Sequence, residues 1–370
     1  MESCVSARWK SEFEMRTSQS TSVRSLAYWW PLISLAAILL VIGGMTAWAG
    51  DGQTKQIVAE MMIRIVVVVG MYIFIGNSGI LSFGHISFMA IGAYAAAWFI
   101  CCTLPMVKPL YLPDLPEFLK DSSYPFGVGV ASAIVLTGLV SFAIGAVLMR
   151  LSGIAATIAT FALLAITASV YGNWEGVTGG SSSISNIPVN VGPWIATAFA
   201  ILILLIAFIH QTSRFGLMLR ATRDDAVAAR SSGISAFKVK LIAFVVSAIC
   251  VGIGGALYAS FLGILTIDAF YFSITFMTLA MLIVGGMRSL AGAVIGVLFV
   301  TAITEIFRFF ENGVSFGDGA MWQLPRGLQE VSLGIIIVLV LIFRPGGLMN
   351  GREIPIFGRR IKDVATQSAH

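Results

Sequence analysis

Apolar segments of about 20 residues recur along almost the whole chain, and they restrict its fold more than any other feature. Hydrophobic residues make up 58% of the 370 residues and charged residues 11%, and the mean hydropathy is +0.92, well above that of ordinary soluble domains. Because lipid offers backbone groups no hydrogen-bond partner, such segments must form helices or a closed barrel. A barrel would show alternating strands of about ten residues instead. The sequence therefore predicts an all-α, polytopic transmembrane helical bundle.

Ten segments are predicted to span the membrane, and several are short or rich in glycine, as re-entrant or broken helices are. They cover residues 28–49, 57–76, 85–102, 126–149, 153–171, 192–210, 241–262, 273–286, 291–309 and 330–344. They separate a polar N-terminal tail (1–27) and a C-terminal tail (345–370) from a transmembrane domain (28–344). The N-terminal tail is too long and too mixed in charge for a secretory signal, so we expect the first span to be retained.

Basic residues are distributed unevenly between the two sides of this predicted bundle. With the N-terminus in the cytoplasm, 17 of the 23 Lys and Arg residues fall in cytoplasmic segments, and only Lys55, Lys108, Lys120 and Arg326 fall in outer loops. Such an excess is typical of the cytoplasmic side, so both termini are predicted to be cytoplasmic. The net charge of +5 is explained in this way and does not indicate nucleic-acid binding.

The longest basic loop, residues 211–240, is predicted to contain a short amphipathic helix from about Leu217 to Ser232. Alanines favour a helix there, and Arg220 and Asp224 are four residues apart. Gly233 is well placed to end the helix in a left-handed cap. Such a helix can insert into a groove of a partner; the alternative is a solvated loop that only fixes the topology.

A second glycine-rich segment, Gly76-Asn77-Ser78-Gly79, permits a sharp turn or a broken helix at the edge of the membrane. Polar side chains within a span either line a cavity or hydrogen-bond to another helix, and both interpretations stay open here. The candidates for a translocation pathway are Asn77, Ser78, Ser82, His85, Thr178, Gly179 and Gly180.

Two pairs of opposite charges fall within the predicted spans. Glu60 and Arg64 are four residues apart, and Glu305 and Arg308 are three apart, so each pair lies on one helix face. An unpaired charge at the bilayer centre costs about 2.5–3.5 kcal/mol, so mutual neutralisation is expected. Ion coupling in a self-sufficient secondary transporter is the alternative.

The segment Gly76–Gly79 also matches the short G-x-S-G pattern of intramembrane serine proteases, with His85 or His210 as the base. The pattern is short and composed of common residues, so it is a weak signal. It would require the base within hydrogen-bond distance of Ser78.

Other chemistry has no motif in the sequence. None of the seven lysines follows a glycine, so the chain has no phosphate-binding G-x-x-x-x-G-K-[ST] loop. The four cysteines form no C-x-x-C pair or other metal-binding spacing. We therefore predict no catalytic residue, no metal site and no bound cofactor, and any ATP chemistry must belong to another chain.

Several separated motifs, in order, resemble the permease subunit of branched-chain amino acid ABC importers, in its longer M-type. The resemblance covers most of residues 57–350. Residues 81–85 with Phe88 and residues 92–94 are similar to the L-S-F/L-G-H…F…G-A-Y segment of the family. The cytoplasmic coupling loop of the family resembles residues 220–225 and 228–234. The remaining motifs are Leu257-Tyr258-Ala259, Gly285-Gly286, Glu305…Arg308 and Arg344-Pro345…Gly347-Leu348.

The resemblance implies an assembly in the bacterial inner membrane. It implies two homologous permeases that form the pathway, two cytoplasmic ATPases that use ATP, and a periplasmic substrate-binding protein. Closure of the ATPases would then rock the spans between inward and outward states. It also implies the residues that contact the ATPase, namely Arg220, Arg223, Asp224, Asp225, Ala228, Ala229, Arg230 and Gly233.

Departures from the family pattern leave the substrate open. The family often has Asn at Tyr72, Glu at Ala165, Glu at Ala226, Gly at Arg288 and Asp-Gly at Ser181-Ser182. Because related permeases carry urea, short amides or aromatic acids, a branched-chain amino acid is the leading expectation among these substrates.

Overall fold

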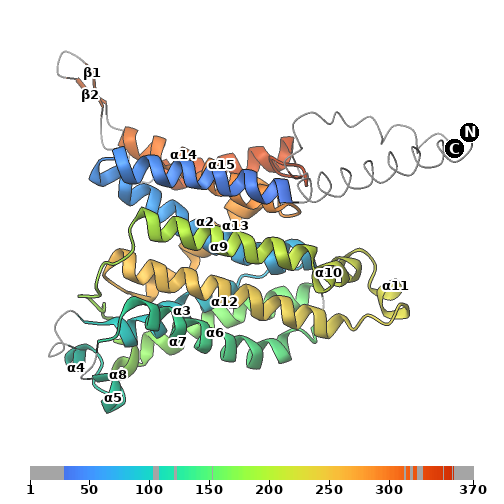
Figure 1. Cartoon of the computed structure of the whole chain (residues 1–370), viewed down its shortest axis with the longest axis horizontal. Coiled ribbons are helices and arrows are strands. Elements are labelled where there is room, and N and C mark those ends of the chain that lie inside the picture. The colour runs from blue at the N-terminus through green and yellow to red at the C-terminus, as the bar shows by residue number, and fades with distance from the viewer. Residues whose placement is uncertain are drawn as a thin grey trace, which may run out of the picture.

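The computed structural model describes residues 29–102, 108–120, 123–151, 153–311, 314–316, 320–322, 328–344, 346–351 and 353. Its long helices run roughly side by side in one bundle (Figure 1). The predicted tail 1–27 and most of the tail 345–370 lie outside the described residues.

Eight stretches of the described helices are long and apolar enough to cross a membrane. They are Trp29–Ala49, α2 (Gly52–Ser78), α6 (Phe126–Leu148), α7 (Ile154–Asn173), α9 (Pro193–Thr212), α12 (Ala236–Leu262), η2 with α13 (Ile267–Phe270 and Phe272–Gly285) and α14 (Leu290–Glu311). Two shorter apolar helices are α3 (His85–Ile100) and α15 (Leu328–Phe343). Each predicted segment coincides with one of these helices, which confirms the predicted helical bundle.

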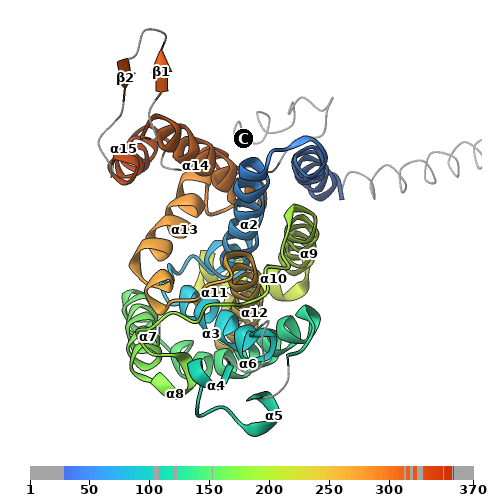
Figure 2. The same ribbon diagram turned by 90° about the vertical axis from the view of Figure 1, so that its left-hand side faces the viewer.

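The connections carry several small elements that the hydropathy pattern does not indicate. They are α4 (Lys108–Tyr111), α5 (Glu117–Lys120), α8 (Glu175–Thr178) and an antiparallel pair of strands, β1 (Val314–Phe316) and β2 (Ala320–Trp322). The short helices lie together at one end of the bundle, which we call the distal end (Figures 1 and 2).

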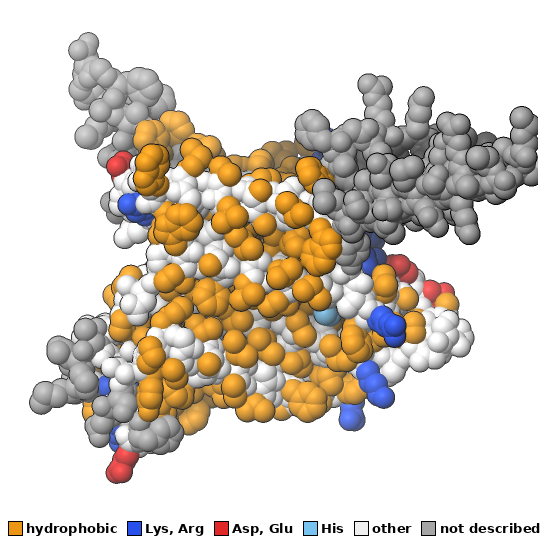
Figure 3. Space-filling model, viewed as in Figure 1, with side chains coloured by type: hydrophobic (Ala, Val, Ile, Leu, Met, Phe, Trp, Pro, Cys, Tyr) orange, Lys and Arg blue, Asp and Glu red, His pale blue; other side chains and the backbone are white. Residues whose placement is uncertain are grey.

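Helix α2 lies at the centre of the bundle and packs against α9, α12, α13 and α14. In α2, 83% of the most apolar 18-residue stretch is buried, whereas only 28% of the corresponding stretch is buried in α6 and in α7. A helix that is apolar all round belongs either in a protein core or in lipid. Helix α2 fits the core, and α6 and α7 fit contact with lipid. Orange apolar side chains cover the side of the bundle in Figure 3, and the charged side chains gather at its two ends. This distribution fits a protein surrounded by hydrocarbon.

Helices α3 and α12 cross closely because glycines face each other's backbone. A Cβ atom at Gly92 of α3 would overlap the backbone of Gly252, and one at Gly255 of α12 would overlap the backbone of Met89. Small residues at a crossing let two membrane helices approach and pack. The glycine of the Gly92-Ala93-Tyr94 motif therefore has a packing role.

The end opposite the short helices carries α10 (Arg214–Asp224) and α11 (Ala226–Ser231), and we call it the coupling end (Figure 1). The first described residue, Trp29, contacts Phe208 near that end of α9, with 5.2 Å between ring centroids. The last one, Glu353, binds the first residues of α14 there. Both ends of the described chain thus lie at the coupling end, and the side of the membrane that this end faces stays a prediction.

The Gly92→Val substitution tests the close crossing. The valine must push α3 away from the backbone of α12, and overpacking of this kind costs about 1–3 kcal/mol. We expect a clearly lower unfolding temperature of the purified protein in detergent. Gly127→Val in α6 is the matched control, because nothing lies within 4 Å of a Cβ at Gly127. Equal melting of the two variants would contradict the packing role.

Candidate coupling site and distal cavities

The predicted single helix from Leu217 to Ser232 is wrong: the loop folds into two helices, α10 and α11, that meet at Asp225. The backbone of Asp225 is extended, with φ −150° and ψ 108°. Its carboxylate accepts hydrogen bonds from the backbone N–H groups of Val227 and Ala228, at 2.8 and 3.0 Å. An aspartate that caps a helix start outweighs the helix propensity of the alanines around it.

These two backbone hydrogen bonds hold the pKa of Asp225 below its usual range. A lowered pKa means that the cap stabilises the fold above the pKa of the unfolded state and is lost only as the pH falls through the folded value. The cap is therefore intact throughout the neutral range. At the other end of α11, Gly233 has φ +80° and Ile234 N–H donates to the Ala229 carbonyl, which confirms the predicted left-handed cap.

Arg223 connects α10 with the C-terminal end of α2. Helix α2 ends at Ser78, and Gly79 closes it in the left-handed conformation, with φ +71°. Ile80 N–H donates to the Ser78 hydroxyl, so the Gly76 carbonyl lacks a helical partner. Arg223 Nη1 donates to that carbonyl at 2.9 Å. A Cβ at Gly79 would lie 2.9 Å from Arg223 Cγ, so the arginine side chain packs directly on this glycine.

Arg220 makes a second connection, to the end of α9. Its Nη2 donates to the Gln211 carbonyl at 2.6 Å, and no bond to Asp224 accompanies it within the described residues. The amide oxygen of Gln211 accepts from the Tyr72 hydroxyl of α2 at 3.1 Å. Helices α2, α9 and α10 are thus joined by polar contacts at one end of the bundle.

Glu353, beyond α15, ties α14 to the same group of contacts. Its two carboxylate oxygens accept from the backbone N–H groups of Leu290 and Ala291, at 2.9 and 3.2 Å. A carboxylate at a helix N-terminus is favoured by the free N–H groups and the helix dipole. The Gln211 amide also donates to Glu353, at 3.4 Å. Sequence analysis missed Gln211 and Glu353, because their partners lie 62 or more residues away or on another helix.

The predicted ATPase-contact residues divide into two groups. Arg220 and Arg223 are half-buried and bind the permease's own helix ends, and Ala229 is buried. The exposed ones are Asp224, Asp225, Ala228, Arg230 and Gly233. Val227, in the first turn of α11, is 73% exposed, and it is an apolar side chain that sequence analysis did not select. We call the exposed residues together with Val227 the α11 surface.

The predicted pathway residues of the Gly76–Gly79 region bond to their own neighbourhood. Asn77 Nδ2 donates to the Ile73 carbonyl at 3.0 Å, and Ser78 accepts from Ile80 N–H at 3.2 Å. The expected turn is confirmed by the end of α2 at Gly79. These contacts favour a role in ending α2 and in positioning the helix end that Arg223 binds.

His85 is fully buried and lies 2.8 Å from the Ser82 hydroxyl through Nδ1. Its ring packs against Phe74 and Phe244, with centroid distances of 5.6 and 5.4 Å. The protease interpretation needs a histidine on Ser78. His85 makes its contacts with other residues, and neither ring nitrogen of His210 has a hydrogen-bond partner in the part of the chain that the structure describes. The geometry therefore gives that interpretation no support.

Thr178, Gly179 and Gly180 form a tight turn at the distal end. The Thr178 hydroxyl donates to the carbonyls of Tyr171 and Trp174, at 2.6 and 2.7 Å. The two glycines have φ values of +75° and +58°. Gly179 borders an open distal hollow of about 560 Å³.

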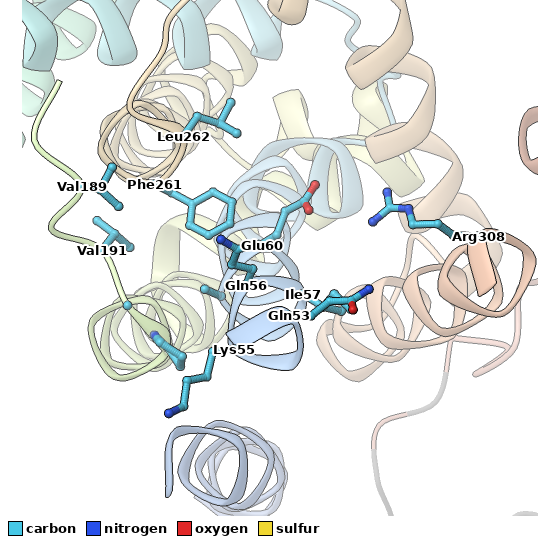
Figure 4. A pocket seen from close by; sticks show the side chains of 13 residues that line it. Gln53, Lys55, Gln56, Ile57, Glu60, Val189, Val191, Phe261, Leu262 and Arg308 are labelled. Atoms are coloured by element: carbon cyan, nitrogen blue, oxygen red, sulfur yellow. The ribbon is translucent and has the colours of Figure 1, made fainter. Parts of the chain in front are cut away.

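Both predicted charge pairs form. Arg64 and Glu60 are 2.5 Å apart, and Arg308 and Glu305 are 2.9 Å apart. Glu60 and Arg308 also border an open vestibule of about 560 Å³ at the distal end, with Lys55 at its edge (Figure 4). In that view the side chains of Glu60 and Arg308 approach the same space from α2 and α14. The pairs therefore neutralise charge and face a cavity at once.

A second cavity, of about 280 Å³, adjoins Glu60 from the other side. It lies among α2, α3, α12, η2 and α13, and its polar lining includes Glu60, Arg64, Tyr258 and Asp268. Neither this cavity nor the vestibule is lined by Asn77, Ser78, Ser82 or His85.

Comparison with known proteins shows which family the chain resembles. The model of the family described as "Branched-chain amino acid transport system / permease component" matches residues 53–342. The LivM permease protein of a high-affinity branched-chain amino acid transport system in Salmonella typhimurium is 26% identical over 349 residues, covering 84% of this chain and 73% of that protein.

Two other relatives show how far the similarity extends. A probable branched-chain amino acid transport permease protein LivM of Methanocaldococcus jannaschii is 21% identical, covering 78% of this chain and 92% of its own length. The autoinducer 2 import system permease protein LsrC of Photorhabdus luminescens is 27% identical over 161 residues, covering 42% of this chain and 44% of that protein. With a family match across nearly the whole bundle, the chain belongs to the permease components of branched-chain amino acid transport systems.

Proposed function

We propose that the chain is the membrane-spanning subunit of an ATP-driven importer in the bacterial inner membrane, with a branched-chain amino acid as its cargo. In this proposal two cytoplasmic ATPases bind and use ATP, and a second homologous permease completes the pathway. A periplasmic binding protein delivers the substrate. The chain itself binds no cofactor.

The proposal rests on one short loop, which has an exposed surface and also donates hydrogen bonds to the ends of helices in the bundle. The α11 surface is free to contact a partner, since Val227 and its neighbours are exposed. On the same loop, Arg223 and Arg220 bind the ends of α2 and α9. A partner that moves α11 therefore pulls on the helix ends of the bundle.

Helix α2 offers a route from that contact to the distal cavities. It is one unbroken helix of 27 residues, so it is about 40 Å long. Gly76, which accepts from Arg223, lies near one end, and Glu60, which borders both cavities, lies in the other half. Movement of α2 as a rigid element would change the cavities when the ATPases close, which is the alternating access that an importer needs.

Ion coupling by the Glu–Arg pairs is the alternative function. Their ion pairs support neutralisation within one helix, because each carboxylate already has its cation. Uptake by vesicles that hold the whole complex distinguishes the two functions. Uptake that persists with an ATPase partner unable to hydrolyse ATP would overturn the importer proposal.

Arg223→Met tests the connection between α10 and α2. The variant removes a charged hydrogen bond to the Gly76 carbonyl and leaves the exposed α11 surface in place. Because a bond of this kind contributes about 1.5–3 kcal/mol, ATP-driven uptake is expected to fall about tenfold or more while the ATPase still co-purifies. Arg214→Met is the control, an exposed arginine on the same helix. Normal uptake by the Arg223 variant would contradict the connection.

Val227→Glu tests the docking surface itself. A charge placed at the centre of an interface leaves an unpaired, desolvated group and weakens binding by about 2 kcal/mol or more. We expect loss of the co-purified ATPase with an unchanged unfolding temperature of the permease, because Val227 is 73% exposed. Val227→Ile, which keeps the position apolar, should retain the ATPase. Retention by both variants would exclude α11 as the contact.

A further inference from the structure

The 280 Å³ cavity is formed mainly by one face each of two helices. Residues 60, 63, 64 and 67 of α2 have helical spacing, as do residues 273, 274, 277, 278 and 281 of α13. Both helices run from the distal end inward, so lower residue numbers lie nearer that end (Figures 1 and 2), and we call the part of the cavity at Glu60, Arg64 and Asp268 its mouth. Its volume is just below the range typical of drug-sized ligands, so it suits a smaller solute.

The mouth of this cavity is charged. Glu60 and Arg64 form their ion pair on α2, and Asp268 on η2 lies across from them. Asp268 is exposed, and its carboxylate forms no ion pair or hydrogen bond with the part of the chain that the structure describes. The mouth therefore holds one cation and two carboxylates, and the carboxylate of Asp268 has no cation partner among the described residues.

The deeper part of the cavity is apolar. Val67 lies about 10 Å further along α2 than Glu60, at the rise of an α-helix. It borders the cavity with Ile63, Met277 and Met281. Methionine side chains adapt to irregular apolar shapes, so such a lining accepts branched aliphatic groups. Charge at the mouth and apolar surface at depth match the two ends of an amino acid with an aliphatic side chain.

We infer that this cavity binds a zwitterionic amino acid with an aliphatic side chain, as the cargo site of the proposed importer. The ammonium group lies against Asp268, the carboxylate against Arg64, and the side chain between α2 and α13. A zwitterion brings an ammonium group to Asp268 and a carboxylate to Arg64, which is shared with Glu60, and it adds no net charge. A solute without an ammonium group would leave Asp268 without a cation. The inference rests on the proposed transport function for the role of the site.

The vestibule supplies the approach to this site. Glu60 lines both the vestibule and the cavity, so the two spaces adjoin at this residue. Arg308 in the vestibule carries positive charge toward Glu60, and Lys55 lies at the edge of the vestibule with its side chain directed away from Glu60 (Figure 4). A solute that enters from the distal end thus meets charges of both signs before the charged mouth.

Binding to the purified full chain in lipid nanodiscs tests the site without any partner. The probes are L-leucine, leucinamide, which lacks the carboxylate, and 4-methylpentanoate, which lacks the ammonium group. We expect saturable binding of leucine by calorimetry, and affinities at least about tenfold lower for both analogues, since each loses a charge-assisted contact. Asp268→Asn should weaken leucine binding about tenfold or more, and Asp51→Asn, an exposed aspartate that lines neither cavity, should not.

A second variant tests the apolar half of the site. Met277→Ala widens the deeper part of the cavity and should raise the affinity for phenylalanine relative to leucine at least about threefold. A merely structural role of Met277 would weaken both ligands together. Equal unfolding temperatures of all variants show that the fold is retained.

Absence of leucine binding by the native chain, or equal binding by the Asp268→Asn variant, would overturn the inference. The proposed function has a separate readout in ATP-dependent leucine uptake by the whole complex. Uptake that is normal in the Asp268→Asn complex leaves the proposed function standing and removes the site. Leucine binding by the chain without any ATP-dependent uptake removes the proposed function instead.

Discussion

The hydrogen bond from Arg223 to the Gly76 carbonyl joins the loop outside the bundle to the helix at its centre. A helix that ends inside a bundle leaves carbonyl groups that lipid cannot satisfy, so the protein must supply donors. Here the donor comes from α10, and Gly79 gives the arginine room because it has no Cβ. The end of α2 is therefore completed by the loop, and neither element keeps its contacts if the other moves alone.

Polar groups within the bundle serve two different purposes. Asn77, Ser78 and Thr178 bond to nearby backbone groups and hold helix ends and turns. Glu60 and Arg64 bond to each other and still border open space. Burial of a polar side chain in a membrane protein is thus compatible with either role, and the cavity decides between them. The glycines and serines of a motif need not lie on the path of a solute.

The sequence predicts the helical bundle well, because each span needs about 20 apolar residues and lipid permits no other open structure. It also predicts the cap at Gly233 and the two charge pairs, which depend on residues three or four apart. It fails at Asp225, where a side-chain cap outweighs helix propensity. It misses Gln211, Glu353 and Asp268, because their roles arise from partners or cavities that only the folded chain brings together.

The central claim is that the loop formed by α10 and α11 and the end of α2 move as one unit when the partner ATPases close. Distances between spin labels in the assembled complex measure this directly. Labels at Ser231 of α11 and at Ile80, just after α2, report on the unit, and Ile80 with Leu151, which follows α6, reports on its movement against the bundle. The account predicts a constant 231–80 distance and a changed 80–151 distance when ATP binds. A changed 231–80 distance with a constant 80–151 distance would contradict it.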